Sequence, residues 1–268
     1  MKKQIWRRPM LVAAMLAGSI GLFTGTASAQ NLTPLATTHF EPKAVQLQGS
    51  EIIIPQLVIG GVWSSSIKLT NRGTSPIPTT NVAFFDNTGA PLNATFQTVS
   101  NGVPGPFVTS AGFSFSLGVG GILDVAFTAD SNIHFGHGMV FCSAVACGTP
   151  GLYGEVILRN SAGVRPDFES VFPFEKPAPL QYMLFDGRNG FTTLLYLINE
   201  NTTATTVSLE VRDMSNNLIR TVTVPFDSLT TQLFTLSDLV PETIGIEGTL
   251  VVKGVTSDRV TNGIALGL

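Results

Sequence analysis

The chain has 268 residues, of which 44% are hydrophobic and only 12% are charged, and its formal net charge is −3 at pH 7. This length is enough for one large domain or for two smaller ones. The acidic balance argues against binding of nucleic acid or of anionic lipid, because both need a basic protein face.

Residues 1–29 have the pattern of a secretory signal peptide. Four basic residues lie between positions 2 and 8, an apolar run occupies residues 10–23, and residues 27–29 read Ala-Ser-Ala, a small-x-small cleavage site. The apolar run is shorter than the roughly 20 residues that span a bilayer, and an N-terminal membrane anchor is the alternative. We expect a mature chain that starts at Gln30, has no integral membrane segment, and is secreted, periplasmic or held at the cell surface.

The first strands are predicted after an extended leader at residues 30–49. Residues 51–59 are an apolar run broken by Pro55. Proline cannot donate to a strand ladder, so we expect an edge strand or a bulged strand there. Residues 63–71 alternate, with Ile67 and Leu69 on one face and polar residues on the other, which predicts a half-buried strand.

Further strands are predicted at residues 82–86, 113–117, 122–128, 139–142 and 153–158. The last two are expected to form a hairpin whose connecting loop carries both cysteines. Residues 161–179 follow and contain four prolines, at positions 166, 173, 177 and 179. Prolines at this density exclude a helix and favour a stiff, extended linker.

The chain then repeats itself. Residues 63–71 read WSSSIKLTN and return without a gap as residues 191–199, FTTLLYLIN. Both copies begin with an aromatic residue, continue with hydroxyl residues and end in Asn. Asp213 repeats Asp86 at the end of the next apolar strand. More strands are predicted at residues 182–185, 220–224, 231–236, 248–253 and 262–268, with one helical turn near Ser237.

Many short strands, spaced about ten residues apart and separated by Gly, Pro and Asn, predict an all-β sandwich or barrel. The charged fraction is about half of the usual 25%, which is typical of exported β-proteins. We therefore predict two tandem modules. The expected divisions are a signal peptide at 1–29, a leader at 30–49, the first module at 50–160, a linker at 161–179 and the second module at 180–268.

A set of motifs in the first copy resembles a known kind of protein. The motifs are Pro55-Gln56-Leu57, Gly60-Gly61 before Trp63, the strand that ends in Asn71, and Phe84-Phe85-Asp86 followed by Gly89 and Pro91-Leu92. They resemble a module of secreted bacterial proteins of unknown function, in which two immunoglobulin-like β-sandwich modules usually lie in tandem. The resemblance covers residues 52–268 and implies that fold, but no activity and no functional residues. The second copy departs from it, with Phe191 in place of Trp and Asn216-Asn217 in place of the Gly turn.

The two cysteines, Cys142 and Cys147, lie in the part expected to be exported. An even cysteine count in an oxidising compartment favours a disulfide between them, with two free thiols as the alternative. Redox chemistry would need the Cys-x-x-Cys spacing, which these residues lack.

His134 and His137 form the only histidine cluster. Two imidazoles at this spacing can bind one metal ion if Asp130 or His39 supplies a third ligand. The alternative is an ordinary loop between glycines. The sequence contains no Gly-x-Ser-x-Gly nucleophile elbow.

Two other motifs have a plain structural interpretation beside a functional one. Residues 86–89 faintly resemble a calcium loop, but a β-turn explains them fully. Trp63 and the many Phe residues could form a platform on which sugars stack. However, Phe191 replaces Trp63 in the second copy, which favours a role as apolar core.

These observations predict an exported, non-enzymatic protein with a structural, adhesive or cell-envelope interaction role and no cofactor. Its partner would be an unidentified protein or glycan at the cell surface. A polysaccharide-binding module is the first alternative, and it predicts several exposed aromatic residues on one sheet face. A metal-dependent enzyme that uses His134 and His137 is the second.

Overall fold

The computed structural model describes residues 33–34, 50–128, 130–142, 151–161, 168–174, 176, 178, 180–254 and 263–267. Within these residues the protein is all-β, as predicted, and its single α-helix has four residues. The predicted signal peptide lies outside the described residues, and so does the leader except for residues 33 and 34. None of the helices within the described ranges is long and apolar enough to cross a membrane.

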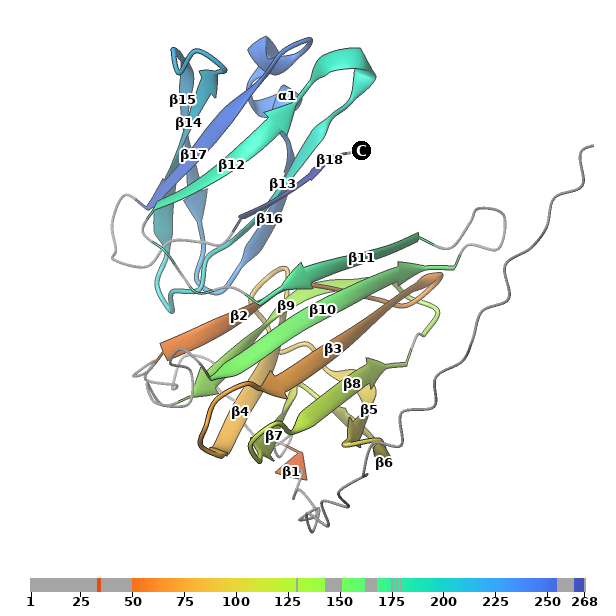
Figure 1. Ribbon diagram of the computed structural model, residues 1–268. Coiled ribbons are helices and arrows are strands. Elements are labelled where there is room, and N and C mark those ends of the chain that lie inside the picture. Colours follow the sequence, from red (N-terminus) through yellow and green to blue (C-terminus); the bar gives the residue numbers. More distant parts are fainter. Residues whose placement is uncertain are drawn as a thin grey trace, which may run out of the picture.

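The N-terminal sheet pair consists of a five-stranded sheet, with the order β1-β7-β4-β9-β2, and a six-stranded sheet, with the order β11-β10-β3-β8-β5-β6. Figure 1 shows this pair in the lower half of the molecule. Its strands are β1 (Thr33–Pro34), β2 (Ser50–Ile59), β3 (Trp63–Asn71), β4 (Ile77–Asp86), β5 (Ala94–Ser100), β6 (Val103–Ser110), β7 (Gly112–Leu117), β8 (Ile122–Phe127), β9 (His134–Cys142), β10 (Leu152–Asn160) and β11 (Phe168–Pro173).

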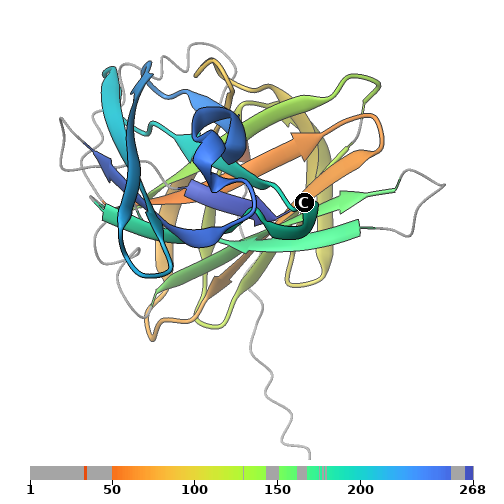
Figure 2. The ribbon, with the colours of Figure 1, turned by 90° about the horizontal axis from the view of Figure 1, so that it is seen from above.

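The C-terminal sheet pair consists of a four-stranded sheet, β12-β17-β14-β15, and a three-stranded sheet, β16-β13-β18. Seen from above, it lies over the N-terminal pair (Figure 2). Its elements are β12 (Leu180–Asp186), the 3-10 turn η2 (Arg188–Gly190), β13 (Thr193–Ile198), β14 (Thr205–Asp213), β15 (Leu218–Phe226), β16 (Thr231–Thr235), helix α1 (Leu236–Leu239), the 3-10 turn η3 (Pro241–Thr243), β17 (Glu247–Gly254) and β18 (Gly263–Gly267).

The two sheet pairs share one strand order. In the N-terminal pair, strands β2-β9-β4-β7 lie side by side in one sheet and β10-β3-β8 in the other. In chain order, β2, β9, β4 and β7 correspond to β12, β17, β14 and β15, and β10, β3 and β8 correspond to β18, β13 and β16. The corresponding strands lie side by side in the same order in the two sheets of the C-terminal pair. The N-terminal pair adds β1, β11 and the hairpin β5–β6.

This order differs from that of an immunoglobulin constant domain. There the first strand pairs with the second, and the last pairs with the sixth. Here the first strand, β12, pairs with the sixth, β17, and the last, β18, pairs with the second, β13. The resemblance to immunoglobulin-like modules therefore extends to antiparallel sheets but not to the partners of the first and last strands.

The structure also shows that the predicted hairpin between residues 139–142 and 153–158 is wrong. Strand β9 pairs with β2 and β4, whereas β10 pairs with β3 and β11 in the other sheet. The chain crosses between the sheets at this point. Alternation of apolar residues assigns a strand's faces but not its neighbours, so it could not exclude the hairpin.

The two repeated Asn residues fix equivalent turns. The buried Asn71 side chain donates hydrogen bonds to the carbonyls of Ser75 (2.9 Å), Leu117 (3.2 Å) and Gly118 (3.0 Å), and its oxygen accepts the Gly73 N–H (2.9 Å).

Asn199 makes the matching bonds in the second copy. It donates to Thr203 (3.0 Å) and Asp227 (2.7 Å) and accepts from the Asn201 N–H (3.0 Å). Each Asn thus joins its own turn to a more distant segment, which explains why both copies end this strand in Asn.

The two repeated Asp residues also form equivalent turns. One carboxylate oxygen of Asp86 accepts the N–H groups of Thr88 (2.8 Å) and Ala90 (3.0 Å). Asp213 accepts those of Ser215 (2.9 Å) and Asn217 (2.8 Å) in the same way. The turn interpretation of residues 86–89 is therefore confirmed.

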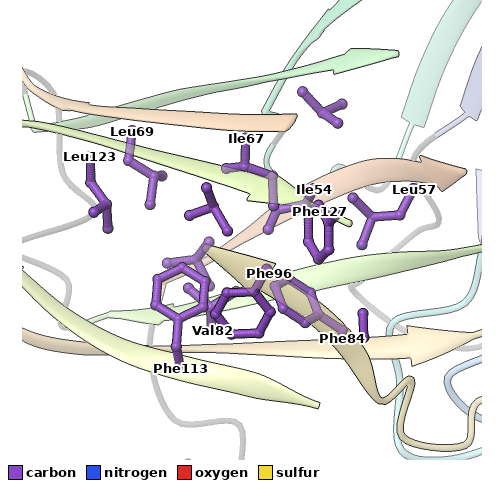
Figure 3. Packing of buried hydrophobic residues seen from close by; sticks show 14 of the residues in the cluster. Ile54, Leu57, Ile67, Leu69, Val82, Phe84, Phe96, Phe113, Leu123 and Phe127 are labelled. Carbon is purple, nitrogen blue, oxygen red and sulfur yellow. The ribbon is translucent and has the colours of Figure 1, made fainter. Parts of the chain in front are cut away.

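Each sheet pair encloses its own apolar core. The N-terminal core is centred on Phe84, whose ring lies 5.9 Å from that of Phe96, 6.0 Å from that of Phe113 and 5.2 Å from that of Phe127 (Figure 3). Burying one such side chain contributes about 1.5–3 kcal/mol. The C-terminal core is smaller and packs Leu209 and Leu250 among the residues buried between its two sheets.

Three parts of the N-terminal pair were not anticipated as strands. The first is β1, which falls within the predicted leader and pairs with β7. Strand β11 falls within the predicted linker and pairs with β10 at the edge of the six-stranded sheet. The hairpin β5–β6 turns at Asn101 and Gly102, which both have positive φ. An Asn-Gly pair between strand-like segments is the strongest short hairpin signal, so the sequence did contain the information for this element.

Candidate functional site

The two sheet pairs meet at an apolar junction. Residues on the outer face of the five-stranded sheet, including Ile53, Phe85 and Met139, form one buried cluster with Tyr196 and Ile198 of β13. Residues 82–85 of β4, 136–140 of β9 and 195–198 of β13 are consequently buried on both faces, and in β4 and β13 these segments read as continuous apolar runs, VAFF and LYLI. Such runs are the sequence signal of a strand covered on two sides.

Hydrogen bonds complete this junction. The Tyr196 hydroxyl donates to the carbonyl of Gly136 over 2.8 Å. Thr231 contacts Asn87 twice, through its N–H to the carbonyl (3.1 Å) and through its hydroxyl to the side-chain oxygen (2.9 Å). Burial raises the pKa of Tyr196 above its ordinary value. The junction thus fixes the orientation of one sheet pair against the other.

His137 lies beside this junction and is fully buried. Its ring stacks on Phe85 at a centroid distance of 5.3 Å. Neither ring nitrogen has a hydrogen-bond partner among the described residues. Burial lowers the pKa of His137 to about 3, against a smaller raising effect of the Asp86 charge. His137 is therefore a neutral part of the junction at ordinary pH.

The structure does not bring His134 and His137 together. Both belong to β9, where residues three apart lie on opposite faces of the strand. His134 is half-exposed and hydrogen-bonds Asp130 at 3.0 Å. His39 lies outside the described residues, and within them no three metal-binding side chains cluster. The interpretation of this segment as an ordinary loop is wrong, because both histidines belong to strand β9. Their places on opposite faces of that strand do not support the alternative in which one metal ion uses both.

The predicted core role of the aromatic residues holds for many of them but not for all. Phe84, Phe113, Phe115 and Phe127 are buried, and Trp63 packs partly buried against the N-terminal core. Phe107, Phe135 and Phe191 are exceptions, because 64%, 42% and 55% of their surfaces are exposed. The buried and partly buried residues therefore form no sugar-stacking platform on a sheet face.

Cys142 is buried at the end of β9. Cys147 lies outside the described residues, so the predicted disulfide between them stays a prediction.

An exposed apolar stripe runs along β12. Leu180, Tyr182 and Leu184 share its outer face, and their exposed fractions are 39%, 68% and 75%. The residues between them, Met183 among them, point toward the core. Because alternate residues of a strand are about 7 Å apart, the stripe is about 14 Å long.

The neighbouring strands give this face a charged border. Tyr182 lies opposite Val251 of β17, which in turn lies opposite Glu210 of β14. Glu210 forms ion pairs with Arg212 (2.9 Å) and with Lys253. Hydrogen bonds from Lys253 and Arg212 lower the pKa of Glu210. The outer face of the four-stranded sheet thus has an apolar half on β12 and a charged half on β14 and β17, where the two cations Arg212 and Lys253 outnumber the one carboxylate of Glu210.

Strand β12 ends beside a cavity of about 330 Å³. The cavity lies where η2, α1 and η3 meet, at the end of the C-terminal pair that faces away from the N-terminal pair (Figure 1). The lining includes the buried Phe185 and Leu236, the exposed Phe191 and Ile244, and the polar Asp186 and Ser237.

Asp186 is held by a two-fold interaction. The Arg188 guanidinium donates to both carboxylate oxygens, over 3.0 and 2.9 Å, and also contacts Glu247. These hydrogen bonds lower the pKa of Asp186 to about 2. The carboxylate is consequently charged at any ordinary pH and is fixed in place.

Sequence reasoning missed both the stripe and the cavity. Residues 182–185 were predicted only to form a strand. The available signal was that large apolar side chains occupy both alternating sets of this segment, which a strand with one face in water does not need. No comparable signal marks the cavity, since its residues come from three separate loops.

Comparison of the chain with protein-family models, with curated proteins and with solved structures found no match.

Proposed function

We propose that the protein is an exported, non-catalytic interaction protein made of two tandem β-sandwich modules. In this proposal it binds a protein partner at the cell surface through the outer face of the four-stranded sheet. The signal-like residues 1–29 support export. The shared strand order and the matching Asn and Asp turns support two copies of one module.

One observation supports the binding face. Ile53 lies opposite Met139 in the N-terminal pair, and Tyr182 lies opposite Val251 at the equivalent place in the C-terminal pair. Ile53 is fully buried at the junction, whereas Tyr182 is largely exposed. The face by which the first module binds the second is thus repeated in the second module, where nothing among the described residues covers it.

The chemistry of this face suits a protein partner. A contiguous exposed apolar patch on a soluble protein is typical of a binding site, and tyrosine is among the residues that contribute most to binding energy. The charged group around Glu210 would form the polar border of such an interface. The partner therefore needs an apolar patch that accepts Tyr182 and Leu184.

Substitution of the stripe tests this proposal. We expect the double variant Tyr182→Ser, Leu184→Ser to fold normally and to bind envelope fractions of the producing cells at least tenfold more weakly in co-sedimentation, since two central apolar contacts are lost. The matched control is Val103→Ser, Phe107→Ser, because these residues of edge strand β6 are as exposed. Equal binding by both double variants would reject the stripe as the binding surface.

A further inference from the structure

The end of the C-terminal pair differs from the same end of the N-terminal pair. Between β2 and β3 the turn is closed, with hydrogen bonds from Gly60 N–H to the Trp63 carbonyl (3.0 Å) and from Gly61 N–H to Asp130 (2.7 Å). Between β12 and β13 the connection is longer and includes η2. It is held by hydrogen bonds of Gly187, with Ile246 and Gly245, both 2.8 Å long.

The longer connection changes the position of its aromatic residue. Trp63 packs against the N-terminal core, but Phe191 lies outside the C-terminal core and lines the cavity. On the opposite side, α1 and η3 replace the short loop before β9 and bring Ile244 to the cavity. The second copy therefore has an aromatic residue at this position that does not pack in its core.

The polar groups of the cavity limit the charge of a ligand. Arg188 is the one cation beside it among the described residues, and it is already bound by Asp186 and Glu247. Two carboxylates against one guanidinium leave a net negative charge, which disfavours anionic ligands. The Asp186 carboxylate accepts three hydrogen bonds, all from Arg188, so lone pairs of this fixed group are still open to a hydroxyl donor.

We propose that this cavity is a binding site for an uncharged saccharide. The Phe191 ring would stack against the C–H face of a sugar ring, because the aromatic face is negative and such hydrogens are weakly positive. Asp186 and the hydroxyl of Ser237 would bind sugar hydroxyl groups. The cavity volume is at the small end of the range for ligand pockets and fits a chain end of one or two sugar rings.

This site is separate from the sheet face on which the proposed function depends, and either can fail alone. The purified protein is titrated with the methyl glycosides of neutral hexoses and of N-acetylhexosamines, and with short cello- and chito-oligosaccharides, using saturation-transfer NMR and calorimetry. We expect at least one to bind with a dissociation constant of about 1 mM or below, corresponding to about −4 kcal/mol.

Substitutions at one aromatic position locate the binding. Phe191→Ala should weaken it at least tenfold, and Phe191→Trp should retain it. Phe107→Ala, at an equally exposed Phe of the N-terminal pair, and Tyr182→Ser should leave it unchanged. Failure of every saccharide to bind up to 50 mM, taken as about fifty times the expected constant, overturns the proposal. So does binding that survives Phe191→Ala, or preferential binding of butylammonium or acetate.

Discussion

The outer face of the five-stranded sheet and the outer face of the four-stranded sheet are equivalent in strand order, but their surroundings differ. The first is covered by β13 through Tyr196 and Ile198, and the second is open to solvent. The equivalent residues differ accordingly: Phe85 of the covered face corresponds in register to Arg212 of the open one, since they precede Asp86 and Asp213.

This difference disfavours further stacking on the C-terminal pair. A C-terminal pair with the largely apolar face of the N-terminal one would attract further copies of the chain, because an unmatched apolar face associates with any complementary one. The C-terminal pair instead places a charged group around Glu210 on half of that face and keeps apolar side chains on β12 alone. The charged half of the open face therefore disfavours a repetition of the internal junction, while the apolar half is the surface to which the proposed function assigns partner binding.

The shared framework of the two sheet pairs predicts the largest effects. Asn71→Ala and Asn199→Ala each remove a buried side chain that joins two segments and leave carbonyls unpaired. We expect the free energy of unfolding, measured in urea, to fall by about 3 kcal/mol or more in both variants. The decrease should be larger for Asn71→Ala, because the Asn71 side chain donates hydrogen bonds to three carbonyls.

The control for these variants is Asn81→Ala. Asn81 is exposed and makes one side-chain hydrogen bond, to Ser114, so its loss should cost about 0.5 kcal/mol. If Asn199→Ala were as mild as Asn81→Ala, the two copies would share the geometry of this turn without sharing its contribution to stability.

At the Asp turns we expect a smaller effect on the free energy of unfolding, and only in the turn that lies at the junction. Gly89 and Asn216 occupy the same place in these turns, and both have positive φ, 81° and 65°. Asparagine therefore satisfies the backbone, but a Cβ on Gly89 would lie 2.7 Å from the Ser228 carbonyl oxygen across the junction. We expect Gly89→Asn to destabilise the protein by about 2 kcal/mol through overpacking.

Substitution of a second glycine is the control that distinguishes the steric contact at position 89 from backbone strain. Gly102 also has positive φ, 83°, but a Cβ there would meet no atom within 4 Å. Gly102→Asn should change the free energy of unfolding by about 0.5 kcal/mol or less, since Asn tolerates this conformation. Equal effects of Gly89→Asn and Gly102→Asn would show that the junction is too loose to sense an added side chain at position 89.

Much of the framework could be predicted from the sequence because its signals are local. The alternation in residues 63–71, the recurrence of Asn71 as Asn199 and the turn at Asp86 each depend on neighbours a few residues away. The pairing of β9 and β10 with different sheets depends on contacts across the whole chain. No local pattern carries that information, which is why the predicted hairpin failed.

The candidate sites were less predictable for a related reason. The histidine pair was judged by its spacing alone, but spacing places two side chains together only once the segment is known to be a helix, a loop or a strand. Phe191 was expected in the core because it aligns with Trp63, yet the longer connection before it moves the ring outward. In both cases the backbone conformation of the segment, which residue spacing and alignment do not reveal, decided the position of the side chain.

The covered and open faces should also differ in their response to acid. His137 faces the junction, and the residue at its place in the C-terminal pair is Thr249, one position after the glycine opposite Asp213. Burial lowers the pKa of His137 from 6.5 to about 3. The unfolded chain therefore takes up a proton below about pH 6.5 that the folded chain refuses, and stability should fall as the pH drops from 6.5 toward 3, by up to about 1.4 kcal/mol per pH unit.

Urea unfolding at about pH 7.0, 6.5, 6.0, 5.5 and 5.0 would measure this slope at roughly 1 to 3 units above the ordinary pKa of exposed carboxylates. His137→Phe should abolish it, because Phe keeps the stack on Phe85 and cannot be protonated. His134→Gln should preserve it. Thr249→His, which places an imidazole at the equivalent position of the open face, should add a much smaller slope, because this position is only partly buried and a better solvated ring differs less in pKa between the folded and unfolded chain. A slope that persists in His137→Phe would mean that another group causes the pH dependence of stability. His137 would then not be the reason for any difference between the two faces in acid.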